Sequence, residues 1–352
     1  MSTLINRSFW QDKPGVLGTI RDSSIPSTLA EGELLVKVHA WGLNPADAFL
    51  QDNPLPFLKY PLIPGQDIAG TVERTGPGPK SQRFRAGDRV LGYATGASSM
   101  AKHENGAFQN FVVLDRALAV KIPVSLSFAE AAVFPLCLAT AGHALFGPKY
   151  LALPPPHPAG APRTGKSLLV WGGASAVGSN AVQLAKAAGF DVLATCSPRN
   201  FEYVLGLGAS KVFDYNAATV VRDIVAEIDK GECAGIFQAA GIKSEAVAPC
   251  CQVSHLSKQK LFVACANLVP EGAVPDGVEA KFVIGEEDRR GMYYDTTSEL
   301  FGKFLEEALR LGTYKVAPRP EAVGIKGLEG IQVGLDIVKR GVSAKKIVVL
   351  AE

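Results

Sequence analysis

The fold is decided by the stretch Leu168-Leu169-Val170-Trp171-Gly172-Gly173-Ala174-Ser175-Ala176-Val177-Gly178, which continues into a run of helical character through residue 186. Its first four residues are apolar, as in a parallel strand covered on both faces, and the paired glycines allow a tight turn. The apolar residues after Gly178 follow helical spacing. A pyrophosphate over the first helical turn would meet unpaired N–H groups and the positive end of the helix dipole. The stretch therefore predicts a dinucleotide site. A glycine turn that only packs a helix on a sheet gives a similar pattern, because this turn is not a strict G-x-G-x-x-G.

Length and composition narrow the class of protein. A chain of 352 residues exceeds a usual single domain, so two domains are expected. The formal net charge of +2 gives no electrostatic signature for nucleic acid or an anionic membrane, and small molecules are the expected partners. The N-terminus lacks the apolar core of a signal peptide, and the apolar stretch 131–146 contains Pro135, Thr140 and His143. The six cysteines form no Cys-x-x-Cys pair. We expect a soluble, cytoplasmic protein with reduced thiols.

Strand patterns dominate the first part of the chain and then give way to alternation. Residues 32–41, 67–72, 87–92 and 110–114 alternate or run apolar between Gly and Pro turns, so residues 1–127 are predicted to be mainly β. Ser127 and Glu130 then have the spacing of a capping box, and strand and helix signals alternate over residues 128–284. This alternation predicts a doubly wound parallel α/β sheet. Residues 285–352 contain helix signals and a final strand at 346–350, which we expect to return to the first domain.

Several further segments carry a family resemblance that covers nearly the whole chain. They are Asn44-Pro45-Ala46-Asp47, Pro64-Gly65-Gln66-Asp67-Ile68-Ala69-Gly70, Phe84-Arg85-Ala86-Gly87-Asp88-Arg89-Val90, Gly106-Ala107-Phe108 and the glycine turn itself. With them the chain resembles the medium-chain dehydrogenase/reductase superfamily, in its zinc-independent, quinone-oxidoreductase-like branch. Residues 197–201, 212–216 and 277–282 are similar to fungal proteins of the CipB-like group and to trans-acting enoyl reductases. The resemblance implies a GroES-like substrate domain over 1–127, a Rossmann NADP(H)-binding domain over 128–284, and a return to the GroES-like domain over 285–352.

The resemblance also bears on metal binding. Zinc-dependent relatives bind the catalytic metal through a Cys, a His and a second Cys, and the corresponding segments here offer Asn44, Gln66 and Cys137. Amides are poor zinc ligands beside imidazole and thiolate, so we expect no metal. Without a metal to polarise a carbonyl, reduction of an activated C=C becomes the natural chemistry. Hydride from a nicotinamide would add to the carbon β to a carbonyl, and the resulting enolate needs hydrogen-bond donors and a proton.

The end of the second strand of the α/β domain favours NADPH as the cofactor. NAD-selective sheets usually carry an acid there, whereas the segment from Ala194 to Asn200 has none. Ser197 can donate to a 2′-phosphate and Arg199 can add charge-assisted contacts. The resemblance places Tyr215 near the same phosphate, although a tyrosine that anchors a loop fits nearly as well.

Other candidate contacts follow from the resemblance. Asn44, Pro45 and Asp47 would border the nicotinamide ribose, and Thr140 the nicotinamide face. The remaining candidate cofactor residues, at the ends of later strands and near the last strand, are Ala240, Gly241, Ala264, Cys265, Ser343 and Lys345. Lys345 could equally be a solvated charge. Tyr60 is the one candidate for a catalytic proton donor, with packing as the alternative, and water could also deliver the proton. Asp67 could serve only to brace the backbone.

Four functions stay open at this point. The leading hypothesis is an NADPH-dependent, metal-independent reductase of activated double bonds in enones, enals, quinones or enoyl substrates. Its close rival is an enoyl reductase that acts in trans on an acyl chain carried by a polyketide synthase of fungal secondary metabolism. The others are a non-catalytic NADPH-binding protein and a biosynthetic enzyme redirected to non-redox chemistry such as cyclisation or elimination. The sequence leaves monomer and homodimer open.

Overall fold

The computed structural model describes residues 5–53, 58–78, 83–96, 102–239, 244–284 and 293–352. The chain divides into two compact units, each formed from more than one stretch of sequence. The first unit comprises Met1–Leu136, Gly285–Arg310 and Arg319–Glu352, and the second comprises Cys137–Ile284 and Leu311–Pro318. The first border therefore lies nine residues after the expected 127, inside a helix, and the short stretch 311–318 belongs with the second unit rather than the first.

The first unit is built around β-sheets, as the Gly- and Pro-punctuated strand pattern predicts. Among its described residues, β1 (Asn6–Trp10) pairs with β2 (Thr19–Ser23), and a larger sheet has the order β14-β15-β3-β4-β5-β7, with β6 also pairing with β3. The strands of the larger sheet are β3 (Glu33–Gly42), β4 (Asp67–Thr75), β5 (Arg89–Tyr93), β6 (Phe111–Asp115), β7 (Ala119–Lys121), β14 (Arg319–Ala322) and β15 (Lys345–Leu350). The last strand, β15, runs antiparallel to β3, so the end of the chain does complete the sheet that its first part begins.

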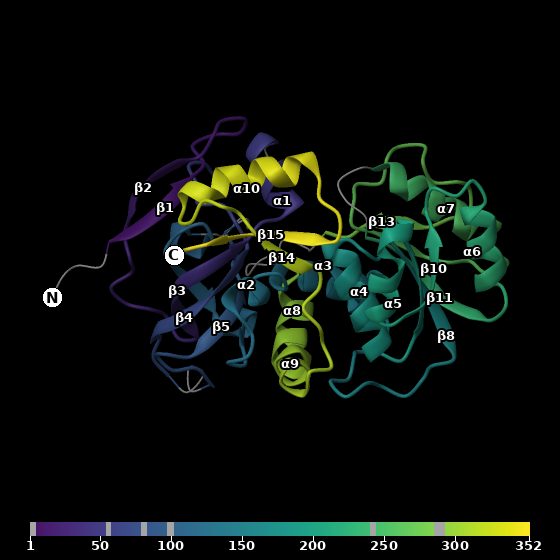
Figure 1. Cartoon of the computed structure of the whole chain (residues 1–352), viewed down its shortest axis with the longest axis horizontal. Helices are drawn as coiled ribbons and strands as arrows, with labels where there is room; N and C mark the ends of the chain where they lie inside the picture. Colours follow the sequence, from purple (N-terminus) through teal and green to yellow (C-terminus); the bar gives the residue numbers. More distant parts are fainter. Residues whose placement is uncertain (1–4, 54–57, 79–82, 97–101, 240–243, 285–292) are drawn as a thin grey trace. The chain divides into compact units, whose positions relative to one another are not determined.

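Helices of the first unit cover this sheet and connect its strands. They are α1 (Pro45–Asp52), α2 (Phe128–Ala131), α8 (Tyr294–Leu300) and α10 (Glu329–Arg340), with a π-helical turn at Phe301–Leu305 and α9 (Glu306–Leu311) following α8. Figure 1 shows α10 beside both α1 and β15. The predicted capping box is present at α2, where Glu130 N donates to Ser127 Oγ at 3.2 Å and Ser127 N donates to the Glu130 carboxylate at 2.9 Å. Apolar side chains of β3, β4, β15 and α10 form the core between these layers.

The second unit is the doubly wound sheet that the alternating pattern predicts. Its parallel strands have the order β10-β9-β8-β11-β12-β13. They are β8 (Lys166–Trp171), β9 (Asp191–Cys196), β10 (Ala209–Asp214), β11 (Glu232–Gln238), β12 (Val263–Cys265) and β13 (Ala280–Phe282). The chain leaves β8 toward β9 and β10, and β11 then continues on the other side of β8. Ligands of such sheets bind at the carboxyl ends of the strands at this reversal.

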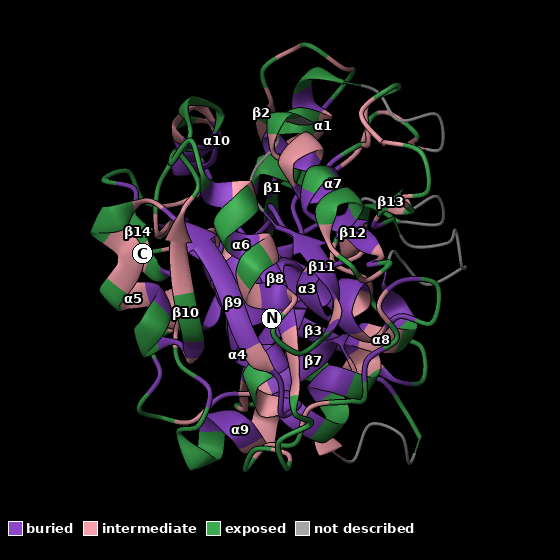
Figure 2. Cartoon of the chain, turned by 90° about the vertical axis from the view of Figure 1, so that its right-hand side faces the viewer, coloured by how far each residue is buried: buried purple, intermediate pink, exposed green. Residues whose placement is uncertain are grey.

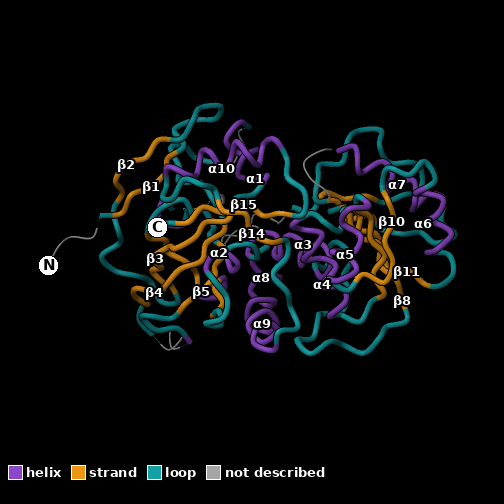
Figure 3. Tube along the Cα trace, in the orientation of Figure 1, coloured by secondary structure: helices purple, strands orange, loops and turns teal. Residues whose placement is uncertain are grey.

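Helices flank the sheet of the second unit on both sides. They are α3 (Pro135–Phe146), α4 (Ala176–Ala187), α5 (Phe201–Gly206), α6 (Val220–Ile228) and α7 (Val247–Leu256). In Figures 1 and 3, α4 and α5 lie on one side of the sheet and α6 and α7 on the other. The central strands β8 and β9 are largely buried, and the edge strand β10 is half-buried or exposed after its first residue, Ala209 (Figure 2). Continuous apolar strands are expected where both faces of a sheet are covered.

Buried polar side chains of α4 explain why residues 311–318 belong to the second unit. The Gln183 side chain accepts from Lys315 N at 2.8 Å and donates to Lys315 O at 3.1 Å, as one strand residue would pair with another. The Tyr314 hydroxyl donates to Asn180 Oδ1 at 2.7 Å. These bonds satisfy both the segment's backbone and the buried amides, which would otherwise cost about 1–3 kcal/mol for each unpaired group.

One helical stretch among the described residues, Phe128–Phe146, is long and apolar enough by length and composition to cross a membrane. In this fold the stretch is mostly buried inside the protein, as for a core helix. The stretch is interrupted between α2 and α3, where Pro135 begins the second helix.

Candidate functional site

The glycines of the strand-turn-helix motif are required by the chain itself. Gly172 has a φ of +91°, in the region that favours glycine. A Cβ on Gly178 would overlap the Gly172 carbonyl oxygen, so α4 can approach the turn this closely only without a side chain there. A Cβ on Gly173 would lie 3.0 Å from Ala194 Cβ and 3.1 Å from a Val204 methyl. Gly173 therefore permits close packing of the turn against β9 and α5.

The N-terminus of α4 presents donors at the carboxyl end of β8. Ser175 caps the helix, since its Oγ accepts from Gly178 N at 2.9 Å and donates to Ala239 O at 2.8 Å. The N–H groups of Ala176 and Val177, in the first turn of this 12-residue helix, have no carbonyl within the helix to bond to. Together with the helix dipole they form the kind of site that binds a phosphate.

The residues expected to select the cofactor lie at the ends of β9 and β10. Ser197 Oγ and Tyr215 Oη are 2.9 Å apart, so the structure brings these two hydroxyls together. Arg199 is exposed in the short 3₁₀ turn Pro198–Asn200, where Asn200 N donates to Ser197 O at 2.8 Å. Tyr215 is 43% exposed. The arrangement leaves two hydroxyls and a guanidinium accessible after the second and third strands, with no carboxylate in the β9 turn.

The other predicted cofactor contacts of the second unit are buried, half-buried or outside the described residues. Ala264 and Cys265 are fully buried within β12, so neither exposes surface to a ligand in this structure. Thr140 is half-buried in α3. Ala240 and Gly241 lie outside the described residues. Contacts of these five residues with a cofactor stay predictions.

In the first unit, Asn44 and Asp47 belong to a buried polar cluster. Asn44 precedes α1, and its backbone N–H donates to Asp47 Oδ2 at 2.8 Å, as in the first turn of a capped helix. The Asn44 amide nitrogen donates to Asp67 Oδ2 at 2.9 Å. The Gln66 amide donates to Asp47 Oδ1 and accepts from the Tyr93 hydroxyl, both at 3.3 Å. Pro45 is exposed, whereas the side chains expected beside a ribose are occupied with one another.

Lys346 completes this cluster and was not expected from the sequence. Its ammonium donates to Asn44 Oδ1 and to Asp67 Oδ2, the latter at 2.8 Å, and the two charged side chains are 3% and 0% exposed. Asp67 Oδ1 also accepts from Leu136 N at 2.6 Å, so Asp67 does brace the backbone. The adjacent Lys345, which was expected near the cofactor, is a half-exposed ion-pair partner of Glu321, and Ser343 is exposed. Both faces of β15 are covered, so strand alternation could not separate the two lysines.

Burial and the neighbouring charges of the cluster change the pKa of the Asp47 carboxyl. Burial raises the pKa of its carboxyl to about 6, and the negative charge of Asp67 adds to the rise. The Asn44 N–H bond, the Lys346 ammonium and the Gln66 amide act in the opposite direction. Burial likewise holds the pKa of the Tyr93 hydroxyl well above its usual value. Asp47 can therefore exchange a proton near neutral pH inside the first unit.

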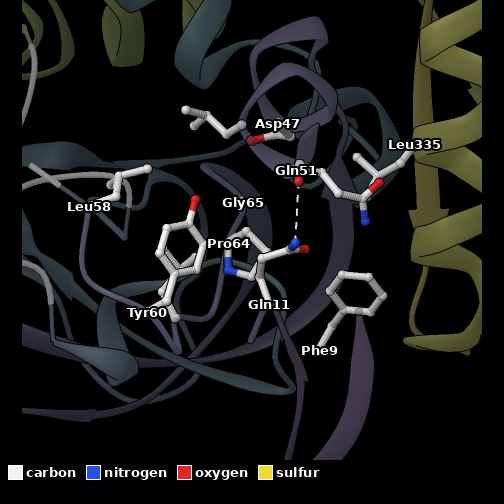
Figure 4. Close-up of a pocket in the computed structure, with 11 residues that line it drawn as sticks. Phe9, Gln11, Asp47, Gln51, Leu58, Tyr60, Pro64, Gly65 and Leu335 are labelled. Atoms are coloured by element: carbon white, nitrogen blue, oxygen red, sulfur yellow. Dashed lines mark hydrogen bonds between the residues drawn. The ribbon is translucent and has the colours of Figure 1, made fainter. Parts of the chain in front are cut away.

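A small pocket of the first unit adjoins this cluster (Figure 4). Asp47, Gln11, Gln51 and Tyr60 contribute its polar groups. The apolar wall comes from Phe9, Leu50, Leu58, Leu62, Pro64 and Leu335. Tyr60 is half-buried, and its hydroxyl has no hydrogen-bond partner among the described residues. Figure 4 shows this hydroxyl directed toward the side of the pocket on which Asp47 lies. Gln11, which sequence reasoning missed, has a buried Oε1 that also lacks a donor within the described chain.

The donor set of the cluster does not fit zinc. The Asn44 and Gln66 amides are engaged with charged or polar neighbours, and an ammonium already occupies the oxygen of Asn44. In the part of the chain that the structure describes, no group of three or more His, Cys, Asp or Glu side chains could hold a metal ion. Metal independence stays a prediction that rests on this donor chemistry.

Comparison with known proteins identifies the family. The model of the alcohol dehydrogenase GroES-like domain matches residues 30–124. The dehydrogenase azaJ of Aspergillus niger is 43% identical over 330 residues, which cover 92% of each chain. The trans-enoyl reductase himH of Aspergillus japonicus is 36% identical and is matched over 99% of this chain and 98% of its own. The crystal structure of an alcohol dehydrogenase superfamily protein from Novosphingobium aromaticivorans has the same fold, with a TM-score of 0.74, 23% identity, and coverage of 99% of this chain and 100% of that one. The protein thus belongs to the medium-chain dehydrogenase/reductase superfamily of oxidoreductases, in the family of these fungal dehydrogenases and trans-enoyl reductases.

Proposed function

We propose that the protein is an NADPH-dependent reductase that adds hydride to a C=C bond activated by a carbonyl, as in enones, enals, quinones and enoyl substrates, without a metal. One observation carries the choice of cofactor: the Ser197 and Tyr215 hydroxyls meet after β9 and β10, Arg199 is exposed in the turn that follows β9, and the segment from Ala194 to Asn200 contains no acid. The name of the relative himH, a trans-enoyl reductase, supports the choice of reaction.

The residues of the second unit would hold the cofactor. The first-turn N–H groups of α4 would bind its pyrophosphate, and the hydroxyls of Ser197 and Tyr215 with the Arg199 guanidinium would bind its 2′-phosphate. Bound NADPH supplies the hydride. In the first unit, the Tyr60 hydroxyl, which is not used by any described neighbour, would give a proton to the reduced substrate.

Steady-state oxidation of NADPH with small enones, quinones and enoyl thioesters tests this function. In the variant Arg199→Ala we expect KM for NADPH to rise by about 10-fold or more while KM for NADH stays nearly unchanged, because only NADPH carries the phosphate. The matched control is Arg222→Ala, which removes an exposed arginine of α6 in the same unit. Equal effects of Arg199→Ala on both cofactors would remove Arg199 from cofactor selection, and no oxidation with any of these substrates would refute the proposed reductase.

A second candidate is an enoyl reductase that acts in trans on an acyl chain carried by a polyketide synthase. The relative himH, which is named a trans-enoyl reductase and is matched over nearly the whole of both chains, favours it. The two candidates differ in the form of the substrate. Turnover of a carrier-bound enoyl chain at much higher kcat/KM than of the matching free thioester would favour the trans-acting enzyme, and the reverse would favour an enzyme of free small molecules. Tight NADPH binding without oxidation would instead indicate a non-catalytic NADPH-binding protein or redirected non-redox chemistry.

A further inference from the structure

The pocket of the first unit is lined by two titratable side chains in different settings. Tyr60 enters it from the loop before β4, and Asp47 enters from α1. The rest of the wall is apolar apart from Gln11 and Gln51. Its free space of about 20 Å³ has room for one water molecule. Such a pocket can shield a proton transfer from bulk solvent without holding many competing waters.

The phenol of Tyr60 is placed to donate. Its oxygen is buried and makes no hydrogen bond within the described residues, whereas buried polar atoms normally have a partner. Burial also raises the pKa of this phenol above its usual value. A tyrosine that gives up its proton here becomes a phenolate in an apolar wall, which is unstable until a proton returns.

Asp47 is held where it can return that proton. Its carboxyl is almost fully buried, and its oxygens accept from Asn44 N at 2.8 Å, from the Asn44 side-chain amide at 3.2 Å and from Gln66 at 3.3 Å. The ionisable groups that face it are Asp67 of β4, Lys346 of β15, Tyr93 of β5 and Tyr60 across the pocket. Among these described groups the one cation, Lys346, is already hydrogen-bonded to Asp67. Burial and the negative charge of Asp67 outweigh its effect on Asp47, so the Asp47 carboxyl tends to keep a proton.

We propose that Asp47 is the proton reserve of Tyr60, an inference that rests on the reductase function proposed above. After hydride has added to the β carbon, the Tyr60 O–H bond breaks and a C–H bond forms at the α carbon with the electron pair of the enolate. The Asp47 O–H bond then breaks, directly or through one water in the pocket, and the phenol is restored. Solvent finally reprotonates the Asp47 carboxylate. The second transfer is downhill, since a carboxyl with a pKa of about 6 gives its proton to a phenolate whose conjugate acid is weaker than free tyrosine. Asp47 acts through Tyr60 and is a positioning residue rather than a catalytic one.

The first test needs neither substrate nor cofactor. Infrared spectra of the protein labelled with ¹³C at the aspartate carboxyls are recorded between pH 5 and pH 8, for the wild type and for Asp47→Asn. We expect a protonated-carboxyl band that disappears from the wild-type spectrum as the pH rises through about 6 and that is absent from the variant. A wild-type spectrum without this band at pH 5 would overturn the inference, whatever the enzyme reduces.

The second test is kinetic and uses the best substrate of the NADPH assay. Tyr60→Phe should lower kcat by about 100-fold or more. Asp47→Asn should lower kcat by about 10-fold with KM for NADPH unchanged, and its pH profile should lose the wild-type step near pH 6. The double variant should be no slower than Tyr60→Phe alone, because Asp47 acts only through Tyr60. The control is Asp52→Asn, an exposed carboxylate at the other end of α1, which should match the wild type.

The outcomes separate the two proposals. Asp47→Asn with the kcat and pH profile of the wild type, or with a further loss in the Tyr60→Phe background, would overturn the proton reserve and leave the reductase intact. A wild-type protein that reduces none of the substrates would refute the reductase, and the infrared titration would still decide separately whether Asp47 holds a proton.

Discussion

The two adjacent lysines of β15 should lose very different amounts of stability on the same substitution. In Lys346→Met the ammonium that bonds Asp67 Oδ2 at 2.8 Å is lost, and a carboxylate with 0% exposure stays behind without its cation. Removing one partner of a buried pair costs about 3–5 kcal/mol. Lys345→Met removes a pair in which the side chains are 34% and 45% exposed, and exposed pairs of this kind contribute about 0–1 kcal/mol. We therefore expect the free energy of unfolding of the first unit to fall about 3 kcal/mol further in Lys346→Met.

Urea unfolding followed by tryptophan fluorescence measures this difference. Trp41 is fully buried in β3 of the first unit and donates to Ala107 O at 2.8 Å. All variants carry Trp171→Phe, which removes the tryptophan of the second unit, so the remaining signal reports on the first unit. The double variant Lys346→Met/Asp67→Asn should recover part of the loss, because it removes the unpaired charge as well as its partner. Equal effects of Lys345→Met and Lys346→Met would refute the reasoning, as would a double variant no more stable than Lys346→Met.

Three further predictions concern pH, the glycine turn and metal. Because the folded-state pKa of Asp47, about 6, lies above its ordinary 3.8, the protein should lose about 3 kcal/mol of stability as pH rises from about 4 through 6. Urea unfolding of Asp47→Asn should show a much flatter dependence of stability on pH. An equally steep dependence would contradict the assignment. Gly178→Ala should lower both the thermal midpoint of the second unit and its NADPH affinity, since the new Cβ would overlap the Gly172 carbonyl. Circular dichroism measures the midpoint and a cofactor titration measures the affinity. A variant like the wild type in both would show that α4 can shift freely. Dialysis against EDTA should leave NADPH oxidation unchanged, because the Asn44 amide is already engaged by Asp67 and Lys346. Activity that is lost to the chelator and restored by zinc would contradict a metal-independent reaction.

The sequence predicts those parts of the fold that depend on neighbours along the chain. Residues 168–186 specify a strand, a tight turn and a helix because apolar periodicity and glycine freedom act within a few residues. The capping box of Ser127 and Glu130 is equally local. The short 3₁₀ turn Pro198–Asn200 is also local and places Ser197 and Arg199 in one segment, so these candidate cofactor contacts could be predicted from the sequence. The contact between Ser197 and Tyr215 required the parallel neighbours β9 and β10, which the α/β alternation implied.

The pocket and the charge cluster were decided by the tertiary structure. Asn44 and Asp67 are 23 positions apart, and Lys346 follows Asp67 by 279, yet all three share hydrogen bonds because β3, β4 and β15 are neighbours in one sheet. Nothing local distinguishes Lys346 from Lys345, since both stand at the start of the same apolar strand. Burial and pairing of a charge depend on the dielectric and partners that distant segments supply, whereas helix, strand and turn preferences depend on adjacent residues. The sequence therefore determined the two kinds of domain and the dinucleotide motif, and only the folded sheet decided which lysine is buried and which carboxyl can hold a proton.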